Sequence, residues 1–469
     1  MLFKPVLLWT DLLLLVLLIS VVSFGIYAYR QKHLRNSWRQ VFNSKIAMVS
    51  GVILLFYVVV GVLDSIHFRK LQEQKDKTTQ QYYAVEVLSV LDLTLMHLKQ
   101  RVEKTYSAPF SIYSFAKETL EKPDGSKSRE FPRLIHAGAH LNTPEAHLMD
   151  IVTTAASGLV AGVGLWLAVC VTILTLLAVR KKTTLMIQLK SLFTYRDGIP
   201  WLYILATVGV MILVFSTAWF LSTKYHIFGT DKVGEDVFYA ALKSIRTGLL
   251  IGTLTTLVML PFALLMGTLA GYLGGWVDDA IQYLYTTLNS VPGVLLIVAS
   301  VLMVQVYINK HPDLFTTDAE RADFRLLALC VILGITSWTG LCRLLRGETL
   351  KLRQAEYVQA AVAFGVSQST IIIRHILPNV MHIVLISVVL DFSALVLAEA
   401  VLSYIGVGVD PTMDSWGSMI NGARLEMARE PMVWWNLAAA FIFMLILVLA
   451  ANLFSDAVRD AFDPQIRKQ

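Results

Sequence analysis

EYVQAAVAFGVSQSTIIIRHILPN, residues 356–379, lies between two long apolar runs and holds the most informative pattern in the chain. Its first half is rich in alanine, a strong helix former, and Gly365 most easily adopts the left-handed conformation that ends a helix. Ser367 can cap a second short helix. Pro378 should end that second helix, because proline lacks the amide hydrogen and clashes with the preceding turn. The stretch therefore predicts a helix, a turn and a second helix at the edge of a membrane.

The whole chain has the composition of a membrane protein. Its 469 residues are 56% hydrophobic and 16% charged, and the mean hydropathy is +0.61. The hydrocarbon core of a bilayer is about 30 Å thick, so one helical span needs about 20 apolar residues. We expect an all-α, polytopic membrane fold with about nine spans. They are expected near residues 6–28, 46–64, 151–179, 200–221, 246–272, 280–306, 325–345, 380–405 and 434–456.

Positive charge is concentrated in the connections between these spans. The net charge is +6 and the isoelectric point is about 9.0. Basic residues gather in regions 30–45, 180–196, 343–374 and 459–468, and cytoplasmic loops of membrane proteins carry such an excess. We expect these regions in the cytoplasm, with the N-terminus outside the cell and the C-terminus inside. Membrane orientation accounts for the excess of positive charge. We therefore expect the chain to contact membrane lipid and not to bind nucleic acid.

The first apolar run is expected to remain as a membrane helix. Lys4 precedes it, its core is uninterrupted and a basic stop follows, which is unlike a cleaved signal peptide. Cys170, Cys330 and Cys342 fall inside or at the ends of expected spans. They are expected to be small buried apolar residues without a disulfide framework.

No pattern for catalysis or metal binding stands out. The chain has no GxxxxGK[ST] loop, no HExxH and no GxSxG, so we expect neither an enzyme nor a bound nucleotide cofactor. His136, His140, His147 and Asp150 could suggest a metal site. Gly138 weakens a regular helical pair of histidines there, and no metal is expected.

Three residues inside the expected spans are candidates for a transport path. Pro292 should kink the sixth span, since it removes a backbone hydrogen bond. Asp391 and Glu399 lie eight residues apart, about two turns along one face of the eighth span. Because a charge inside a bilayer is costly, they should line a translocation path or make a polar contact at a subunit interface. Both interpretations stay open.

The opening stretch resembles the EAA loop of ABC-importer permeases. The matching residues are Gln359, Ala360, Ala361, Gly365, Leu377 and Pro378, with Glu356 beside them. In that family the element is a coupling helix that sits in a groove of a cytoplasmic ATPase, so the resemblance implies that segment 350–378 couples to such a subunit. An ordinary amphipathic helix at the membrane surface is the alternative.

Other segments resemble the dipeptide and oligopeptide C-type subunits of the same family. Segment 36–55 is like the family's first core helix, and segment 226–237 is like a GTDxxGRDV signature, with Gly229, Thr230 and Asp231. Segment 415–419 is like an SWG element with Trp416, and segment 452–464 is like the family's C-terminal ending. Segment 390–410 also resembles the family. The resemblance implies that segments 226–237 and 415–419 lie at the external mouth. Trp416 is expected to be an interfacial anchor more than a ligand contact.

The likeness covers residues 36–66 and 226–467, which suggests a division of the chain. The expected parts are an extra N-terminal helix and basic loop (1–35), the first core helix (36–66), an external insertion (67–150), an inserted transmembrane hairpin (151–225) and the permease core (226–469). In the insertion, Leu88, Leu91, Leu95, Leu98 and Val102 predict one helix with an apolar seam, for packing inside that domain or for docking to a partner.

Two residues depart from the family pattern. Gln359 stands where the family has the glutamate of EAA, and Glu235 stands where it has the arginine of GRD. Losing the carboxylate removes a charge-assisted contact to an ATPase, so docking should depend more on shape and on neighbouring charges.

The resemblance implies a permease subunit, in a bacterial inner membrane, of an ATP-driven, binding-protein-dependent importer, most like those for di- or oligopeptides. The resemblance implies a second permease subunit, two ABC ATPase subunits or domains that use the ATP, and an external binding protein. The alternatives are a membrane-anchored sensor or scaffold whose insertion binds a ligand, and a membrane-embedded enzyme. The motifs do not identify the cargo, since peptide and nickel permeases share them.

Overall fold

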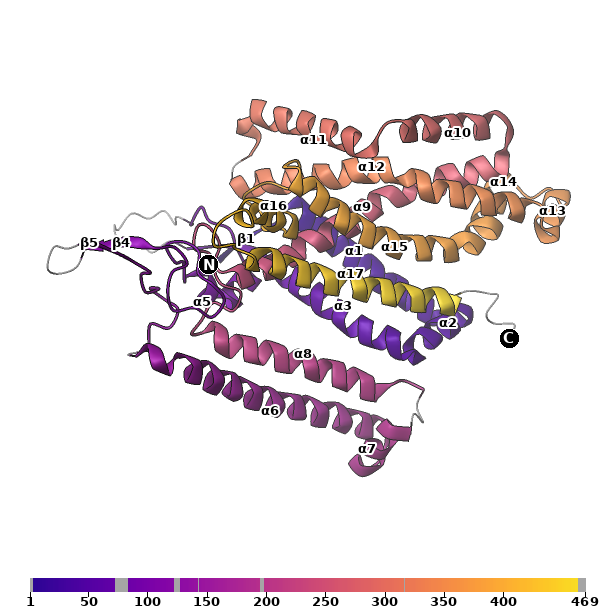
Figure 1. Cartoon of the computed structure of the whole chain (residues 1–469). Helices are drawn as coiled ribbons and strands as arrows, with labels where there is room; N and C mark the ends of the chain where they lie inside the picture. Colours follow the sequence, from indigo (N-terminus) through magenta and orange to yellow (C-terminus); the bar gives the residue numbers. More distant parts are fainter. Residues whose placement is uncertain are drawn as a thin grey trace.

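The computed structural model describes residues 3–71, 83–121, 127–141, 143–194, 198–315 and 317–462. Within these residues nine helices are long and apolar enough to cross a membrane, and they run alongside one another as a bundle (Figure 1). The prediction of a mostly helical polytopic fold is confirmed. The nine helices are α1 (Trp9–Arg30), α3 (Lys45–Asp64), α6 (His147–Lys181), α8 (Trp201–Ser222), α9 (Val237–Leu273), α11 (Gly293–Lys310), α12 (Asp318–Arg353), α15 (Leu377–Tyr404) and α17 (Trp435–Phe462).

One end of the bundle carries short strands and is called the strand end (Figure 1). Strands β1 (Phe3–Val6), β2 (His67–Lys70) and β3 (Leu88–Ser89) form an antiparallel sheet in that order. Strands β4 (Glu118–Glu121) and β5 (Lys127–Glu130) form a separate antiparallel pair. The sequence analysis did not predict these strands, because each has at most four residues and shows no clear alternation.

The opposite end is called the α13 end, after the helix that projects there (Figure 1). It also carries α2, α7 and the last turns of α17, so the described parts of the four basic regions meet at one end of the bundle. Arg196, Arg467 and Lys468 lie outside the described residues. The remaining short helices are α2 (Lys32–Asn43), α4 (Val90–Thr94), α5 (Met96–Lys99), α7 (Leu185–Thr194), α10 (Gly275–Ser290), α13 (Glu356–Ala363), α14 (Gln368–Ile371), α16 (Trp416–Glu426), the 3-10 turns η1 (Pro144–Ala146) and η2 (Pro312–Leu314), and the π-helical turn η3 (Ile372–Ile376).

Helices α9 and α12 pack closely at the centre of the bundle because α9 presents glycines to its neighbour. A Cβ atom on Gly267 would lie 2.9 Å from the carbonyl oxygen of Cys342, and one on Gly271 would lie 2.7 Å from that of Arg346. Without hydrophobic drive between helices in lipid, such close backbone approach is a main source of packing energy. Asp236 caps the start of α9 by accepting from the amides of Phe238 and Tyr239, which begins this helix nine residues before the expected span.

The sixth span differs from the prediction. Residues 280–306 do not form one kinked helix; the chain breaks at Val291 and Pro292 into α10 and α11. Pro292 is the residue before the first turn of α11, where its fixed φ and missing amide hydrogen cost nothing. The guanidinium of Arg346 holds α10 against α12 through two hydrogen bonds of 2.5 and 2.7 Å to Asp278.

The leucine seam near residue 90 is also different from the prediction. Leu88 lies in β3, and Leu95 separates two short helices, α4 and α5, so the leucines do not share one helix. Leu91, Leu95 and Leu98 are nevertheless buried, in the same cluster as Phe238 of α9. The seam therefore packs against the end of the helical bundle.

Candidate functional site

The end of α13 is formed as the sequence predicts. Gly365 has φ of +74°, and its amide donates to the carbonyl of Val362 at 3.0 Å while the amide of Val366 donates to that of Ala361 at 3.1 Å. This pair of bonds is the Schellman motif that closes a helix at a left-handed glycine. The chain therefore reverses sharply after Phe364.

The second predicted helix does not end at Pro378. Helix α14, the π turn η3 and α15 form one continuous helix from Gln368 to Tyr404. The prediction was wrong because a π turn widens the backbone just before the proline, so Pro378 sits in the first turn of α15, where a missing amide hydrogen is tolerated. Ser367 holds the expected cap position, but its hydroxyl bonds to that of Thr370 at 2.8 Å.

The candidate coupling residues divide between a buried and an exposed face. Ala361 is buried with Val358, Ile371 and Ile376 in the cluster at the α13 end. The other candidates, Glu356, Gln359, Ala360, Gly365 and Pro378, are exposed, and Leu377 is half-buried.

Phe364 is the most exposed large apolar side chain at this tip, at 87%. The sequence analysis did not single it out, although an aromatic residue directly before a helix-ending glycine was the available signal. Val362 and Ile373 add exposed apolar surface nearby. An unpartnered apolar tip beside charged residues is typical of a protein-binding surface.

Two hydrogen bonds fix α13 to its neighbours. The side-chain amide of Gln359 donates to the carbonyl of Gln354 at 3.3 Å, at the end of α12. The side-chain amide of Asn379 donates to the hydroxyl of Tyr357 at 3.1 Å and so joins α13 to α15. A glutamate at position 359 could not donate to a carbonyl, so the departure from the family pattern has a local structural role here.

Glu399 lies near the strand end of α15 and is only 2% exposed. Its carboxylate accepts from the hydroxyl of Ser403 at 2.6 Å, and a Cβ atom on Gly417 would lie 2.7 Å from it. Asp391, two turns earlier, is half-buried. The structure thus turns Glu399 toward the start of α16.

The loop with Gly229, Thr230 and Asp231 packs at the strand end. The Thr230 hydroxyl accepts from the amide of Ser107 at 2.7 Å, and the Thr230 carbonyl accepts from the indole of Trp435 at 2.9 Å. A Cβ atom on Gly229, whose φ is +67°, would clash with the carbonyl oxygen of Ser107. Asp231 accepts from the amide of Glu235 at 2.9 Å, which closes the loop.

Next to this loop, a buried histidine lies between two carboxylates. His226 Nδ1 lies 2.6 Å from Asp236, and its Nε2 lies 3.6 Å from Glu103. Burial alone would lower the pKa of His226, but the two carboxylates raise this pKa to about 9. Burial would raise the pKa of Glu103, but His226 and three backbone amides lower it to about 2. These charges hold Glu103, and residues 135–137 whose amides donate to it, against the start of α9.

Trp416 is not an interfacial anchor, so that expectation was wrong. It is 1% exposed at the start of α16, and its indole donates to the carbonyl of Ala241 at 3.1 Å. Gly248 of α9 makes room for the ring, since a Cβ atom there would lie 2.8 Å from it. The sequence could not reveal that another helix covers this tryptophan.

The histidines once considered for a metal make other contacts. His140 lies 2.8 Å from Asp150, and His147 lies 2.8 Å from the carbonyl of Phe110. Within the described residues no three potential ligands are grouped to hold a metal ion. Cys170, Cys330 and Cys342 are free thiols; Cys330 and Cys342 are buried, as expected, whereas Cys170 is half-buried.

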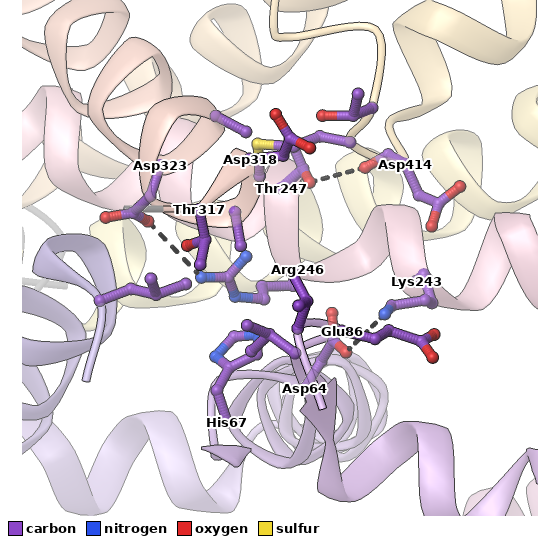
Figure 2. Close-up of a pocket in the computed structure, with 17 residues that line it drawn as sticks. Asp64, His67, Glu86, Lys243, Arg246, Thr247, Thr317, Asp318, Asp323 and Asp414 are labelled. Carbon is purple, nitrogen blue, oxygen red and sulfur yellow. Dashed lines mark hydrogen bonds and ion pairs between the residues drawn. The ribbon is translucent and has the colours of Figure 1, made fainter. Parts of the chain in front are cut away.

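A cavity of about 330 Å³ opens at the strand end between α9, α12 and the strands (Figure 2). Its ionisable lining residues are Asp64, His67, Glu86, Lys243, Arg246, Asp318, Asp323 and Asp414. Lys243 donates to Asp92 at 2.9 Å, and Arg246 donates to Asp11 at 2.7 Å. The sequence analysis missed these residues because they come from segments far apart in the chain.

The candidates thus form two groups at opposite ends of the bundle. The candidate coupling residues, in 356–378, lie at the α13 end, whereas Thr230, Glu399, Trp416 and the cavity lie at the strand end (Figure 1). This separation is what a protein needs to link an event on one side of a membrane to one on the other.

Comparison with known proteins identifies chains similar to this one. Residues 263–468 match the family model described as binding-protein-dependent transport system inner membrane component. The oligopeptide transport system permease protein OppC of Haemophilus influenzae is 30% identical over 243 residues, covering 52% of this chain and 71% of that protein. The dipeptide transport system permease protein DppC of Bacillus subtilis is 31% identical over 243 residues, covering 52% and 70%. The glutathione transport system permease protein GsiD of Pectobacterium atrosepticum is 32% identical over 244 residues, covering 52% and 73%.

Among solved structures, a chain of the MetNI methionine ABC transporter in inward-facing conformations aligns with a TM-score of 0.36 and 15% identity, covering 47% of this chain and 94% of that one. The family match and the curated relatives, together with the nine apolar helices, establish the family. The chain belongs to the inner-membrane permease components of binding-protein-dependent transport systems, in the group that contains the peptide permeases of the OppC and DppC type.

Proposed function

We propose that the chain is the transmembrane permease subunit of an ATP-driven importer for di- or oligopeptides. Its family membership and the peptide-transport names of its relatives support this proposal. The observation that carries the coupling role is the geometry of α13, which is anchored on one face through Ala361 and exposes Phe364 at its tip. An exposed aromatic on a rigid support suits insertion into a groove of another protein.

The importer requires partners. A second permease subunit completes the pathway, two cytoplasmic ABC ATPase subunits or domains bind at the α13 ends, and an external binding protein delivers cargo. The sequence has no phosphate-binding loop, so the partner ATPases use the ATP.

The proposed mechanism is alternating access. ATP binding draws the ATPases together, and segment 350–378 transmits the movement to the helices, which open outward to accept cargo. Two features favour this transmission of movement, because both join the α13 tip directly to a membrane helix. They are the continuous helix from Gln368 to Tyr404 and the hydrogen bond between Tyr357 and Asn379. Hydrolysis then resets the helices.

In this proposal the α13 end faces the cytoplasm and the strand end faces outward. The gathering of the basic regions at the α13 end supports that orientation. Residues 67–150 are then an external insertion and 151–225 an inserted hairpin, while Gly229, Thr230, Asp231 and Trp416 belong to the external mouth. Pro292, Asp391 and Glu399 are assigned to the path or to the interface with the second subunit.

The test is Phe364→Asp in the transporter co-expressed with its genomically adjacent ATPases. We expect loss of ATPase co-purification and of peptide uptake into proteoliposomes, with normal insertion of the permease. The matched control is Val233→Asp, an equally polar change at a 62% exposed residue of the strand end, which should retain the ATPase. Undiminished ATPase binding by the Phe364 variant would rule out docking at this tip.

A sensor or scaffold is the competing class of function. It predicts that the purified chain brings down no protein with a nucleotide-binding loop and that peptide uptake is absent. Labelling of a Phe364→Cys variant from each side of the membrane adds a direct check, since the importer requires that residue to be inside.

A further inference from the structure

The cavity in Figure 2 combines residues of the family core with residues outside it. Segments 317–323 and 412–414 lie within the matched region 263–468, while Leu8, His67 and segment 85–87 lie before it. The extra N-terminal part of the chain therefore supplies one wall of a space at the strand end. Apolar side chains such as Leu8, Ala322 and Met413 alternate there with charged ones.

The lining of the cavity carries an excess of negative charge. Its carboxylates are Asp64, Glu86, Asp318, Asp323 and Asp414, and its permanent cations are Lys243 and Arg246. Both cations are also engaged by carboxylates behind the lining, since Lys243 bonds to Asp92 and Arg246 bonds to Asp11. The two cations cannot neutralise the whole set.

Asp414 is the lining carboxylate left without a protein counter-charge in contact. Glu86 pairs with Lys99 at 2.7 Å, and Asp323 accepts from the amide of Thr10 at 3.2 Å. The carboxylate of Asp414 has no hydrogen bond or ion pair within the part of the chain that the structure describes.

The position of Asp414 is nevertheless fixed. Its backbone carbonyl accepts from the Thr247 hydroxyl at 2.7 Å, and Figure 2 shows it across the cavity from Asp323. Burial raises the pKa of Asp414 to about 7, Lys243 opposes this, and the charges of Glu235, Asp64 and Asp92 add to the rise. A cation arriving beside Asp414 would relieve that cost.

The same residue lines a second, larger cavity of about 730 Å³. Lys243, Thr412, Met413 and Asp414 form the shared boundary of the two spaces. At its far side, the guanidinium of Arg429 lies 5.0 Å from the ring centre of Tyr106. That wall therefore already accommodates an organic cation, supplied by the chain itself.

The chemistry favours an organic cation over a metal ion. Calcium and magnesium need several oxygen ligands converging within about 2.0–2.6 Å of one point. The described carboxylates do not converge in that way. A volume of about 330 Å³ with mixed apolar and charged walls suits a small organic group instead.

We infer that this cavity binds a primary ammonium group of the cargo, with Asp414 as its counter-charge. The inference rests on the proposed function and names the part of a peptide that the external mouth recognises. The ammonium could be the N-terminus of a peptide or the end of a lysine side chain, which share this chemistry.

The test measures ligand binding to the complete transporter in detergent, without the binding protein, by calorimetry. The probes are trialanine, N-acetyl-trialanine and an N-acetylated tripeptide with one lysine. We expect trialanine, the lysine peptide or both to bind, and N-acetyl-trialanine, which has no ammonium group, not to bind. Asp414→Asn should weaken the ammonium-dependent binding by at least roughly tenfold, and Asp414→Glu should restore most of it. The control is Asp313→Asn, an exposed residue outside the cavity.

The inference would be overturned if the wild type and Asp414→Asn bound the ammonium-bearing probes equally. It would also be overturned if the wild type bound all three probes equally. Peptide uptake by the wild-type complex, measured in parallel, separates this from the proposed function. If peptides are taken up but their binding does not depend on Asp414, only the ammonium site is rejected. If no peptide is taken up, the importer proposal is rejected.

Discussion

Arg246 on α9 donates to Asp11 in the first turn of α1 at 2.7 Å, and both side chains are buried. The same guanidinium donates to the hydroxyl of Thr10 at 3.1 Å, and the Thr10 amide donates to Asp323 on α12. The N-terminal helix is thereby tied to α9 and α12, the two central helices of the bundle, by charges and hydrogen bonds.

Breaking this pair should destabilise the protein strongly. Arg246→Met removes the guanidinium from buried Asp11 and leaves its carboxylate with only His67 at 2.7 Å. Loss of one member of a buried pair typically costs about 3–5 kcal/mol. We expect a large drop in the thermal unfolding midpoint in detergent, and a smaller drop for the double variant Arg246→Met with Asp11→Leu than for the sum of the single variants. The exposed Lys351–Glu348 pair is the comparison, since Lys351→Ala should change stability by about 0–1 kcal/mol. Additive single effects at Arg246 and Asp11 would show that the two do not interact.

Gly365→Ala tests backbone conformation at the α13 tip. A Cβ atom there meets no other atom within 4 Å, so the only penalty is the left-handed φ of +74°, about 1–2 kcal/mol. We expect the Schellman turn to open and peptide uptake to fall, while membrane insertion stays normal. Gly347→Ala in α12 is the matched control, because that position is equally open and has no positive φ. It should be neutral or slightly stabilising. Similar uptake by the two variants would contradict the role of the turn.

Gly271→Ala tests the close contact of α9 with α12. The new methyl group would lie 2.6 Å from the Thr349 Cβ and 2.7 Å from a backbone oxygen, which cannot move aside easily. Overpacking of this kind costs about 1–3 kcal/mol, so the unfolding midpoint should fall. Gly340→Ala, where a Cβ meets nothing within 4 Å, should leave it unchanged. If Gly271→Ala had the same unfolding midpoint as the wild type, α9 and α12 would accommodate the methyl group without loss of stability.

The pair formed by His226 and Asp236 predicts a pH dependence. The pKa of His226 is about 9 in the folded protein and about 6.5 when unfolded. Its stabilisation is therefore complete below pH 6.5 and is lost as the pH rises through 9, at about 1.4 kcal/mol for each unit of pKa difference. We expect the unfolding midpoint to fall between pH 7 and 9.5. His226→Gln should flatten that fall, and an unchanged pH profile in the variant would assign the effect to another group. Glu103, with its lowered pKa, stays charged throughout this range.

The sequence predicted well what depends on local pattern and composition. The number of spans follows from runs of about 20 apolar residues, and the end of α13 follows from Gly365, whose conformation few other residues adopt. The common end of the basic regions follows from charge alone.

What the sequence could not predict depends on contacts between distant segments. Trp416 was expected at a membrane interface, and only the fold reveals that Gly248 leaves room for its ring inside the protein. Pro378 was expected to stop a helix, because a π turn has no recognisable sequence pattern. Arg246 stood out in no motif, since Asp11 lies 235 residues away.

The π turn has a consequence for the far end of the same helix. An α-helix advances about 100° for each residue, so deleting one residue between Ile372 and Ile376 would rotate everything that follows by that angle. Glu399 and Ser403 lie on the same helix and would rotate together, away from Gly417. The carboxylate of Glu399, which is now enclosed by protein, would then face another surface. A single widened turn beside the α13 tip thus sets the angular register of the polar groups at the strand end of the bundle.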